Sequence, residues 1–86
     1  MYVIMVYDVG VERVSKVLKI GRVYLTWIQN SVFEGEITDA NFVRLQDEIA
    51  QVIDKRVDSV LFFCLKSRYD SKVVIGKNKN EPGIFV

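Results

Sequence analysis

Histidine is absent from the sequence, and cysteine and proline occur once each among its 86 residues. Without histidine the chain has no imidazole base, and with one cysteine it cannot assemble a thiolate zinc site, so zinc sites and Ser-His-Asp catalysis are excluded. The single Cys64 cannot form an internal disulfide. We therefore expect a protein of the reducing cytosol that folds without disulfide or zinc cross-links.

Long hydrophobic runs and glycine-rich loops are also missing. The apolar run near the N-terminus ends at Tyr7, has no basic flank and is followed by no small-residue cleavage site, so it fits neither a membrane span nor a signal peptide. Gly10 and Gly21 match no phosphate-binding or dinucleotide-binding fingerprint. The absences exclude a membrane protein and argue against a nucleotide cofactor.

The composition of the chain predicts one compact domain. Half of them are hydrophobic and 12% are aromatic, which is enough to fill a core in a chain of this length. The net charge of +1 conceals an uneven distribution, because residues 34–65 are acidic whereas residues 1–33 and 66–86 are basic. Two basic segments are compatible with a nucleic-acid partner.

Hydrophobic periodicity predicts four elements in the first half of the chain. Residues 2–7 are continuously apolar and indicate a central strand, and residues 11–21 predict a helix with a basic outer face. Residues 23–28 and 32–37 predict a hairpin. Its second strand places acidic side chains on a solvated face, namely Glu34 and Glu36.

The second half predicts a helix that begins at Thr38 or Asp39 and ends near Arg56, followed by a buried strand over residues 60–65. The resulting strand-helix-strand-strand-helix-strand order indicates the α+β class, as a ferredoxin-like βαββαβ sandwich with both helices on one face of the sheet. We expect residues 1–76 to form this domain. The tail, residues 77–86, is expected to add a C-terminal strand to a sheet edge, with a frayed chain end as the alternative. The shorter candidate strands are residues 72–75 and 84–86.

Asp8 follows the first buried strand directly and permits two interpretations. It forms an Asx turn or caps the helix after Gly10, as aspartate commonly does. Alternatively it is a metal ligand, since Mg²⁺ is often held by one or two carboxylates and can activate water without histidine. One chain supplies a single well-placed carboxylate, but a two-fold dimer would bring two copies of Asp8 together around a cation.

Basic residues recur along the first predicted helix and could follow a phosphate backbone, although any surface helix carries such charges. These candidate nucleic-acid-binding residues are Arg13, Lys16, Lys19 and Arg22. No aromatic residue lies between them, and Tyr24 and Trp27 are interpreted as core or interface residues. A second basic cluster lies in the tail and is equally compatible with solvated charge.

Three segments together resemble the CRISPR-associated Cas-two family: YVIMVYDV at residues 2–9, QNSVFEGEIT at residues 29–38 and DSVLFFCL at residues 58–65. The resemblance implies a ferredoxin-like homodimer that acts with an integrase partner in spacer acquisition. It also implies Mg²⁺-dependent or Mn²⁺-dependent endonuclease activity on single-stranded RNA or double-stranded DNA, with Asp8 as the metal-binding catalytic residue. By motif match, Ser31 and Phe33 lie near that active site.

The same resemblance leaves a second function open. In spacer acquisition the protein can serve as a structural adaptor that bridges integrase dimers and holds DNA, while its partner carries out the chemistry. We therefore carry both an endonuclease and an adaptor as hypotheses for a cytoplasmic, nucleic-acid-binding homodimer with no membrane contact.

Overall fold

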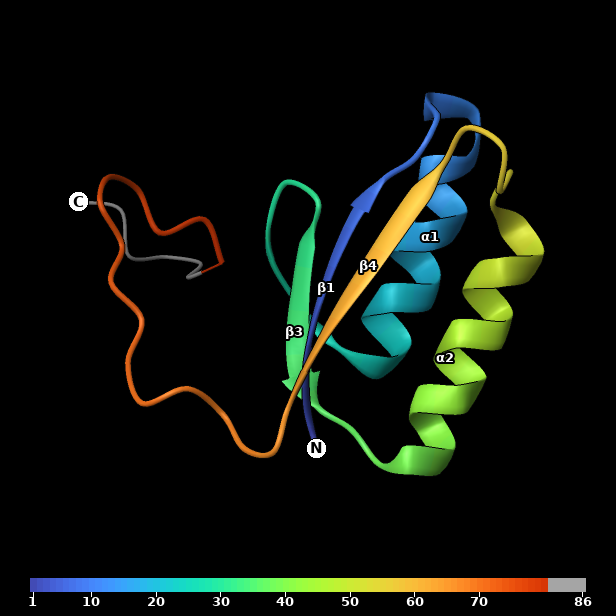
Figure 1. The fold of residues 1–86 in the computed structure, drawn as a ribbon. Coiled ribbons are helices and arrows are strands. Elements are labelled where there is room, and N and C mark those ends of the chain that lie inside the picture. The colour runs from blue at the N-terminus through green and yellow to red at the C-terminus, as the bar shows by residue number, and fades with distance from the viewer. Residues whose placement is uncertain (81–86) are drawn as a thin grey trace.

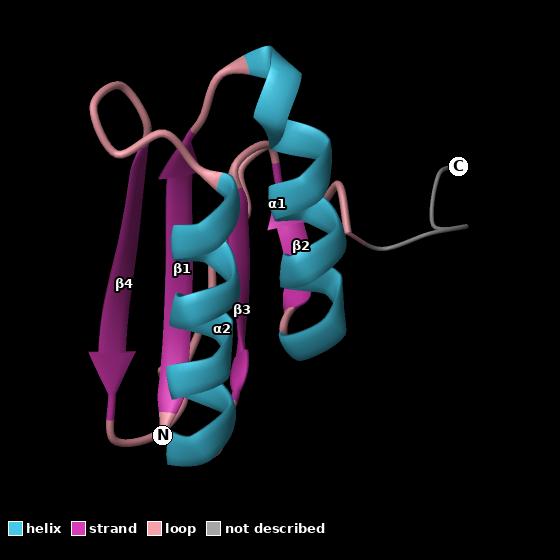
Figure 2. Ribbon diagram, turned by 90° about the vertical axis from the view of Figure 1, so that its right-hand side faces the viewer, coloured by secondary structure: helices cyan, strands magenta, loops and turns pink. Residues whose placement is uncertain are grey.

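The computed structural model describes residues 1–80 as one four-stranded sheet with two helices against one of its faces (Figures 1 and 2). The expected α+β, ferredoxin-like architecture is confirmed. The elements follow in the order β1 (Tyr2–Asp8), α1 (Val11–Tyr24), β2 (Thr26–Gln29), β3 (Val32–Glu36), α2 (Asp39–Val52) and β4 (Ser59–Leu65).

The sheet has the strand order β2-β3-β1-β4, and every neighbouring pair is antiparallel. The apolar strand β1 is therefore central, paired with β3 on one side and with β4 on the other. The β1–β4 register runs from Tyr2 opposite Leu65 to Asp8 opposite Ser59. The end of β1, the beginning of β4 and the first turn of α1 thus meet at one corner of the molecule (Figure 1).

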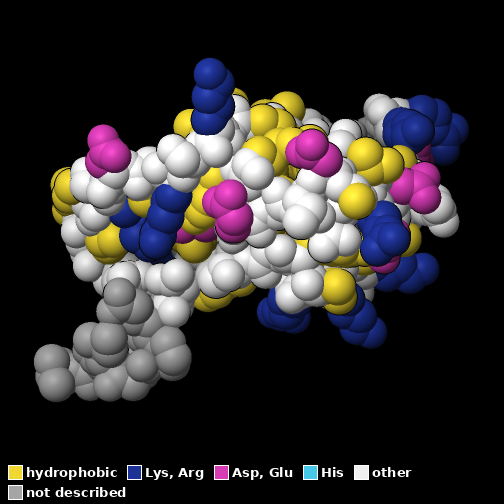
Figure 3. All heavy atoms as spheres, turned by 90° about the horizontal axis from the view of Figure 1, so that it is seen from below, with side chains coloured by type: hydrophobic (Ala, Val, Ile, Leu, Met, Phe, Trp, Pro, Cys, Tyr) yellow, Lys and Arg dark blue, Asp and Glu magenta, His cyan; other side chains and the backbone are white. Residues whose placement is uncertain are grey.

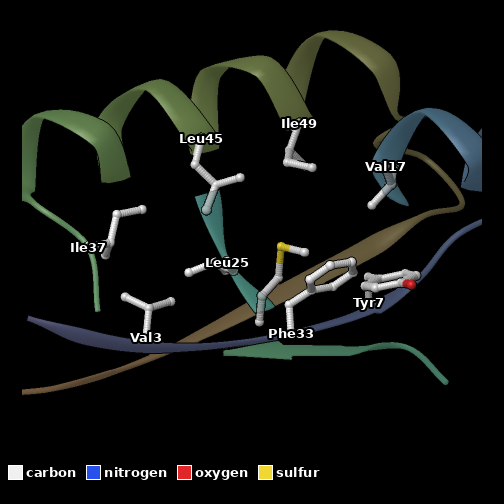
Figure 4. Packing of buried hydrophobic residues seen from close by; sticks show 9 residues of the cluster. Val3, Tyr7, Val17, Leu25, Phe33, Ile37, Leu45 and Ile49 are labelled. Carbon is white, nitrogen blue, oxygen red and sulfur yellow. The ribbon is translucent and has the colours of Figure 1, made fainter. Parts of the chain in front are cut away.

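The hydrophobic core lies between the sheet and the two helices (Figure 4). Because side chains alternate along a strand, β1 directs Val3, Met5 and Tyr7 towards the helices, and all three are buried. Phe33 of β3 is fully buried beside them, with its ring against the buried Gly21 of α1. This packing fixes the position of the β1 end relative to α1.

The prediction that the first helix ends near Gly21 is wrong, since α1 continues to Tyr24 and β2 begins only at Thr26. Gly21 is a packing residue inside the helix and does not end it. A Cβ atom there would lie 2.9 Å from the ring of Phe33, so the absence of a side chain allows α1 to approach the sheet closely. Leu25 ends the helix, with its backbone N–H still bonded to the Gly21 carbonyl.

Thr38 is the N-cap of α2, because its hydroxyl oxygen accepts a hydrogen bond of 3.1 Å from the Asn41 N–H. The helix ends at Val52, before the expected Arg56. Ile53 already has extended backbone angles, and the residues that follow form a turn in which the Asp54 carbonyl accepts from the N–H groups of Val57 and Asp58. A compact loop therefore leads into β4.

The expected solvated position of Glu34 is wrong. This carboxylate is buried because Tyr69, from the segment after β4, donates a hydrogen bond of 2.5 Å to it and packs edge to face on Tyr2. That segment leaves the sheet on the side away from the helices (Figure 1). Residues 72–75 form no strand, and residues 84–86, with the proposed edge pairing of the tail, lie outside the described residues.

Candidate functional site

Asp8 is exposed at the last position of β1. By strand alternation its side chain projects on the same side as Ile4 and Val6, which is the face of the sheet without helices. Within residues 1–80 its carboxylate makes no hydrogen bond or ion pair. The carboxylate is thus free to bind an external ligand.

The capping interpretation of Asp8 does not agree with this geometry. The N-cap of α1 is Gly10, and no side chain makes a capping hydrogen bond there. The α1 N-terminus instead receives its support from Asp58, whose carboxylate accepts from the Gly10 N–H at 2.9 Å. Asp8 therefore has no capping role at the α1 N-terminus.

Ser31 lies in the β2–β3 turn, beside the end of β1. Its carbonyl accepts a hydrogen bond of 3.1 Å from the N–H of Tyr7, the residue before Asp8, and this bond places the turn beside the end of β1. The preceding Asn30 has a positive φ of 41°, a conformation that asparagine tolerates in turns. Its carbonyl accepts from both the Tyr7 hydroxyl and the Trp27 indole. Ser31 is therefore held at the corner where Asp8 is exposed.

Phe33, by contrast, does not face the candidate site. It is fully buried among core residues, and its ring lies against Tyr7 with centroids 6.1 Å apart (Figure 4). The Phe33 side chain occupies the helix side of the sheet, against the residue before Asp8, whereas Asp8 projects on the other side, so the expected place of Phe33 near the active site stays a prediction. Its contribution is to pack the sheet beneath the corner.

Arg13 is likewise not on the outward basic face that the helical periodicity suggested. Its guanidinium donates through Nε and Nη2 to the two carboxylate oxygens of Asp58, at 2.5 and 2.9 Å, and through Nη1 to Glu12 at 2.7 Å. The prediction that Arg13 faces solvent is wrong, since three of its nitrogens are already engaged. Hydrogen bonding to Asp58 also holds the pKa of this guanidinium above its usual range.

Asp58 is the buried half of this pair, with a side chain only 1% exposed. Besides Arg13 and Gly10, the Asp54 N–H donates to it at 2.8 Å. The Arg13 hydrogen bonds, followed by those from the Asp54 and Gly10 backbone, hold the pKa of Asp58 well below its usual range even though burial opposes ionisation. Asp58 is therefore an ionised carboxylate near neutral pH, and its oxygens are occupied by protein donors.

The other predicted nucleic-acid-binding residues, Lys16, Lys19 and Arg22, are exposed along α1. Over the face of the molecule shown in Figure 3, Lys and Arg side chains are interspersed with acidic and apolar ones and form no continuous basic patch. Tyr24 and Trp27 are partly buried, and the Tyr24 hydroxyl donates to Glu48 of α2. Both aromatics therefore pack against the protein, as expected.

A second feature adjoins Asp8: the face of the sheet opposite the helices is apolar and partly uncovered. We call it the open face, and define it by Ile4, Val6, Leu61, Phe63 and Leu65. Leu61 and Phe63 are each more than half exposed. Exposed apolar patches of this kind on a small domain indicate an interaction surface.

The sequence contained a signal for Asp58 that periodicity alone did not reveal. Asp58 precedes the apolar run of β4, just as Asp8 follows the apolar run of β1. Once the two strands are paired antiparallel, the aspartates must lie at the same end of the sheet. The pairing of Asp58 with Arg13, 45 residues away, depends on tertiary structure and could not be predicted from local pattern.

No group of three or more potential metal-ligating side chains lies close together within residues 1–80. A cation at this corner would thus depend on Asp8 together with water, substrate phosphate or a second copy of the chain. None of the helices in the described part of the chain is long and apolar enough to cross a membrane.

Comparison with known proteins gives concordant results. The family model described as CRISPR associated protein Cas2 matches residues 1–73. A protein of Dictyoglomus turgidum named CRISPR-associated endoribonuclease Cas2 is 50% identical over 82 residues, covering 94% of each chain. A protein of the same name from Pyrococcus furiosus is 49% identical over 80 residues, covering 93% of each. A crystal structure of Cas2 superposes with a TM-score of 0.88 at 40% identity, covering 100% of this chain and 98% of the other.

Proposed function

Because this chain belongs to the CRISPR-associated Cas2 family, we propose that it is an endonuclease that hydrolyses phosphodiester bonds through Asp8. The observation that carries the proposal is the exposed Asp8 carboxylate, which has no partner within residues 1–80 and lies at a corner where three elements meet. Relatives named endoribonucleases support RNA as a substrate, with double-stranded DNA as the second substrate class.

The chemistry of Asp8 fits Mg²⁺ or Mn²⁺. A solvent-exposed carboxylate without protein donors offers a hard oxygen ligand to an ion that keeps several waters and binds substrate phosphate. Asp8 is the residue that would hold the ion. A bound ion would lower the pKa of a water nucleophile and offset phosphate charge. Asp58 does not fit this role, because protein donors already occupy both its oxygens.

The proposed active unit is a homodimer. The open face is apolar and exposed, and Asp8 projects from its end, so isologous pairing through this face would bury Phe63 and Leu61 and place both copies of Asp8 at one interface. A two-fold axis near the end of β1 would then bring the two carboxylates together. Like charges at short range favour a cation between them.

The substrate would contact the outward side of α1 through Lys16, Lys19 and Arg22. Arg13 is left out of this set because Asp58 and Glu12 already engage its guanidinium. Phosphate contacts of this type fix the position of a nucleic acid without reading its sequence. Binding is therefore expected to be nearly sequence-independent.

The test compares the parent with Asp8→Asn, using labelled single-stranded RNA and short duplex DNA with Mg²⁺, with Mn²⁺ and with EDTA. An amide keeps the shape of the carboxylate but loses its charge, so cleavage should fall to background in the variant and in EDTA, while the circular dichroism spectrum is unchanged. Ser15→Ala, an exposed change on α1, is the control. A variant that cleaves as fast as the parent would remove Asp8 from the mechanism.

A second function, that of a non-catalytic adaptor bridging integrase dimers and holding DNA, is favoured by one observation. Within residues 1–80, Asp8 is the one carboxylate at this corner that no protein donor engages, and no three potential ligands lie close together. The same assay separates the two functions. An adaptor would bind duplex DNA with equal affinity in the parent and in Asp8→Asn, and neither protein would cleave it.

A further inference from the structure

The surroundings of Asp8 raise the question of what orients it, because its own carboxylate makes no hydrogen bond within residues 1–80. The position of this side chain must then follow from the backbone on either side. Upstream, β1 is fixed by its pairing with β3 and β4. Downstream, only Val9 and Gly10 separate Asp8 from α1, so this short junction determines how rigidly the end of the strand is held.

A single carboxylate fixes that junction. Asp58 accepts hydrogen bonds from the Gly10 N–H, the Arg13 guanidinium and the Asp54 N–H. It therefore joins the β1–α1 junction, the first turn of α1 and the loop before β4. Its neighbour Ser59 is the residue opposite Asp8 in the β1–β4 register. The contacts of Asp58 thus lie immediately downstream of Asp8 and in the loop that leads to the β4 residue opposite it.

Glycine at position 10 is part of the same arrangement. Its backbone angles, φ −55° and ψ 146°, are accessible to any residue, so conformational freedom does not explain it. Lack of space for a side chain explains the glycine, because a Cβ atom at this position would lie 2.5 Å from Arg13 Nη2. The end of a free arginine could move away, but this guanidinium is bound to the buried Asp58 through two nitrogens. A methyl group there would break the bidentate pair while leaving both charged side chains in the chain.

We propose that the Arg13–Asp58 ion pair, together with Gly10, is a positioning unit for Asp8 that holds the end of β1 in the geometry needed for phosphodiester cleavage. The inference rests on the proposed function of Asp8. Neither member is a catalytic residue, since both are occupied with protein partners. Misplacement of a reacting group by about 1 Å can cost on the order of a hundredfold in rate. The unit would therefore affect turnover and not substrate affinity.

The experiment uses the full chain with labelled single-stranded RNA and Mg²⁺, and compares Asp58→Asn, Gly10→Ala and Asp8→Asn with the parent. Asp58→Asn and Gly10→Ala should each lower kcat at least about tenfold and leave KM within about twofold. Amide hydrogen exchange, measured without substrate and corrected for the intrinsic rate of each residue type, should be at least about tenfold faster at residue 10 and at Asp54 in both variants. Arg56→Ala is the matched control, since it breaks an exposed ion pair with Asp54 in the same loop. It should change neither kcat nor exchange at Gly10.

The outcomes test the positioning inference and the proposed function of Asp8 separately. If Asp8→Asn is inactive while Asp58→Asn and Gly10→Ala keep the kcat of the parent, the positioning inference is overturned and the proposed function stands. If Asp8→Asn cleaves like the parent, or the parent does not cleave, the proposed function fails, and unchanged exchange at Gly10 would then overturn the structural part of the inference as well. Should Asp58→Asn not fold, Gly10→Ala decides, because it retains both charges.

Discussion

At the scale of single residues, the molecule contains two aspartates at one end of the sheet with opposite environments. Asp8 is exposed and without a partner within the described residues, whereas the Asp58 side chain is buried under hydrogen bonds from Arg13 and two backbone N–H groups. The same side chain therefore leaves its charge exposed to solvent in one case and is tied into the fold by hydrogen bonds in the other. Environment, not residue type, separates the two roles.

The depressed pKa of Asp58 makes stability depend on pH in a definite direction. The unfolded carboxyl has a pKa of about 4, so its stabilising contribution is complete above that pH and is lost as the pH falls towards the lower folded value. Thermal unfolding at several pH values should therefore show the melting temperature of Asp58→Asn below that of the parent at pH 7, with the difference shrinking below about pH 4. A difference that stays constant in acid would mean that the ion pair with Arg13 contributes no stability.

Gly21 allows a second test at this scale. In a helix, Gly→Ala normally stabilises by about 1 kcal/mol, but here the new Cβ would lie 2.9 Å from the Phe33 ring, which is fully buried and cannot move freely. Overpacking of a core costs about 1–3 kcal/mol, so we expect a net destabilisation of about 1 kcal/mol. Denaturant unfolding measures it. Ser15→Ala, on the exposed side of the same helix, should be neutral or stabilising, and a stabilised Gly21→Ala would show that the core accommodates a methyl group.

At the scale of elements, local pattern predicted most of the fold. The apolar runs at β1 and β4 and the periodic helices α1 and α2 have the expected type and order because each carries its signal within its own residues. The predicted end of α1 was wrong because glycine commonly ends helices, whereas Gly21 lies inside this helix to leave space for the ring of Phe33, which is distant in sequence. The interpretation of Glu34 failed for a similar reason, since the residue that covers it is Tyr69.

The candidate site likewise contains one residue that local sequence pattern identified and one whose contacts it did not predict. Asp8 could be selected from sequence because it directly follows a buried strand. Arg13 was assigned to a solvated face because a helical wheel records direction but not the partner that another loop brings to it. Its actual partner, Asp58, is adjacent only once β1 and β4 have paired. Contacts between residues that are distant in the sequence could therefore not be predicted from the single sequence.

The exposed lysines of α1 provide the test at this scale. Each duplex phosphate that a protein neutralises contributes about −0.9 to the slope of log K against log salt concentration. Replacing Lys16 and Lys19 with alanine should therefore flatten the slope for duplex DNA by about one to two units, measured by fluorescence anisotropy over a salt series. A double change of Lys55 and Arg56 to alanine removes the same charge from the α2–β4 loop and should leave the slope unaltered. Equal slopes for all three proteins would show that α1 is merely solvated.

At the scale of the whole molecule, the two faces of the sheet differ in how much of their surface is covered. The helices cover one face of the sheet completely enough to bury Val3, Met5 and Tyr7 (Figures 1 and 2). On the other face, the segment after β4 makes contact through Tyr69, which bonds to Glu34 and packs on Tyr2. Among the described residues, Leu61 and Phe63 stay exposed on this open face. A chain of 86 residues buries a limited share of its surface alone, so a second copy on this face would add core as well as a second carboxylate.

Phe63 is the residue with which to test that arrangement. Its side chain is 55% exposed on the open face, opposite Ile4 in the register, so a charge there costs the monomer little but would be buried without a partner in a dimer. Phe63→Asp should weaken dimerisation at least about a hundredfold, about 2.7 kcal/mol, and should abolish Mg²⁺-dependent cleavage together with it. Val43→Asp is the control, because Val43 is similarly exposed but lies on α2. Sedimentation velocity at micromolar concentration measures the oligomeric state. A parent that sediments as a monomer would overturn the proposed dimer, and a Phe63→Asp variant that remains dimeric would place the interface elsewhere.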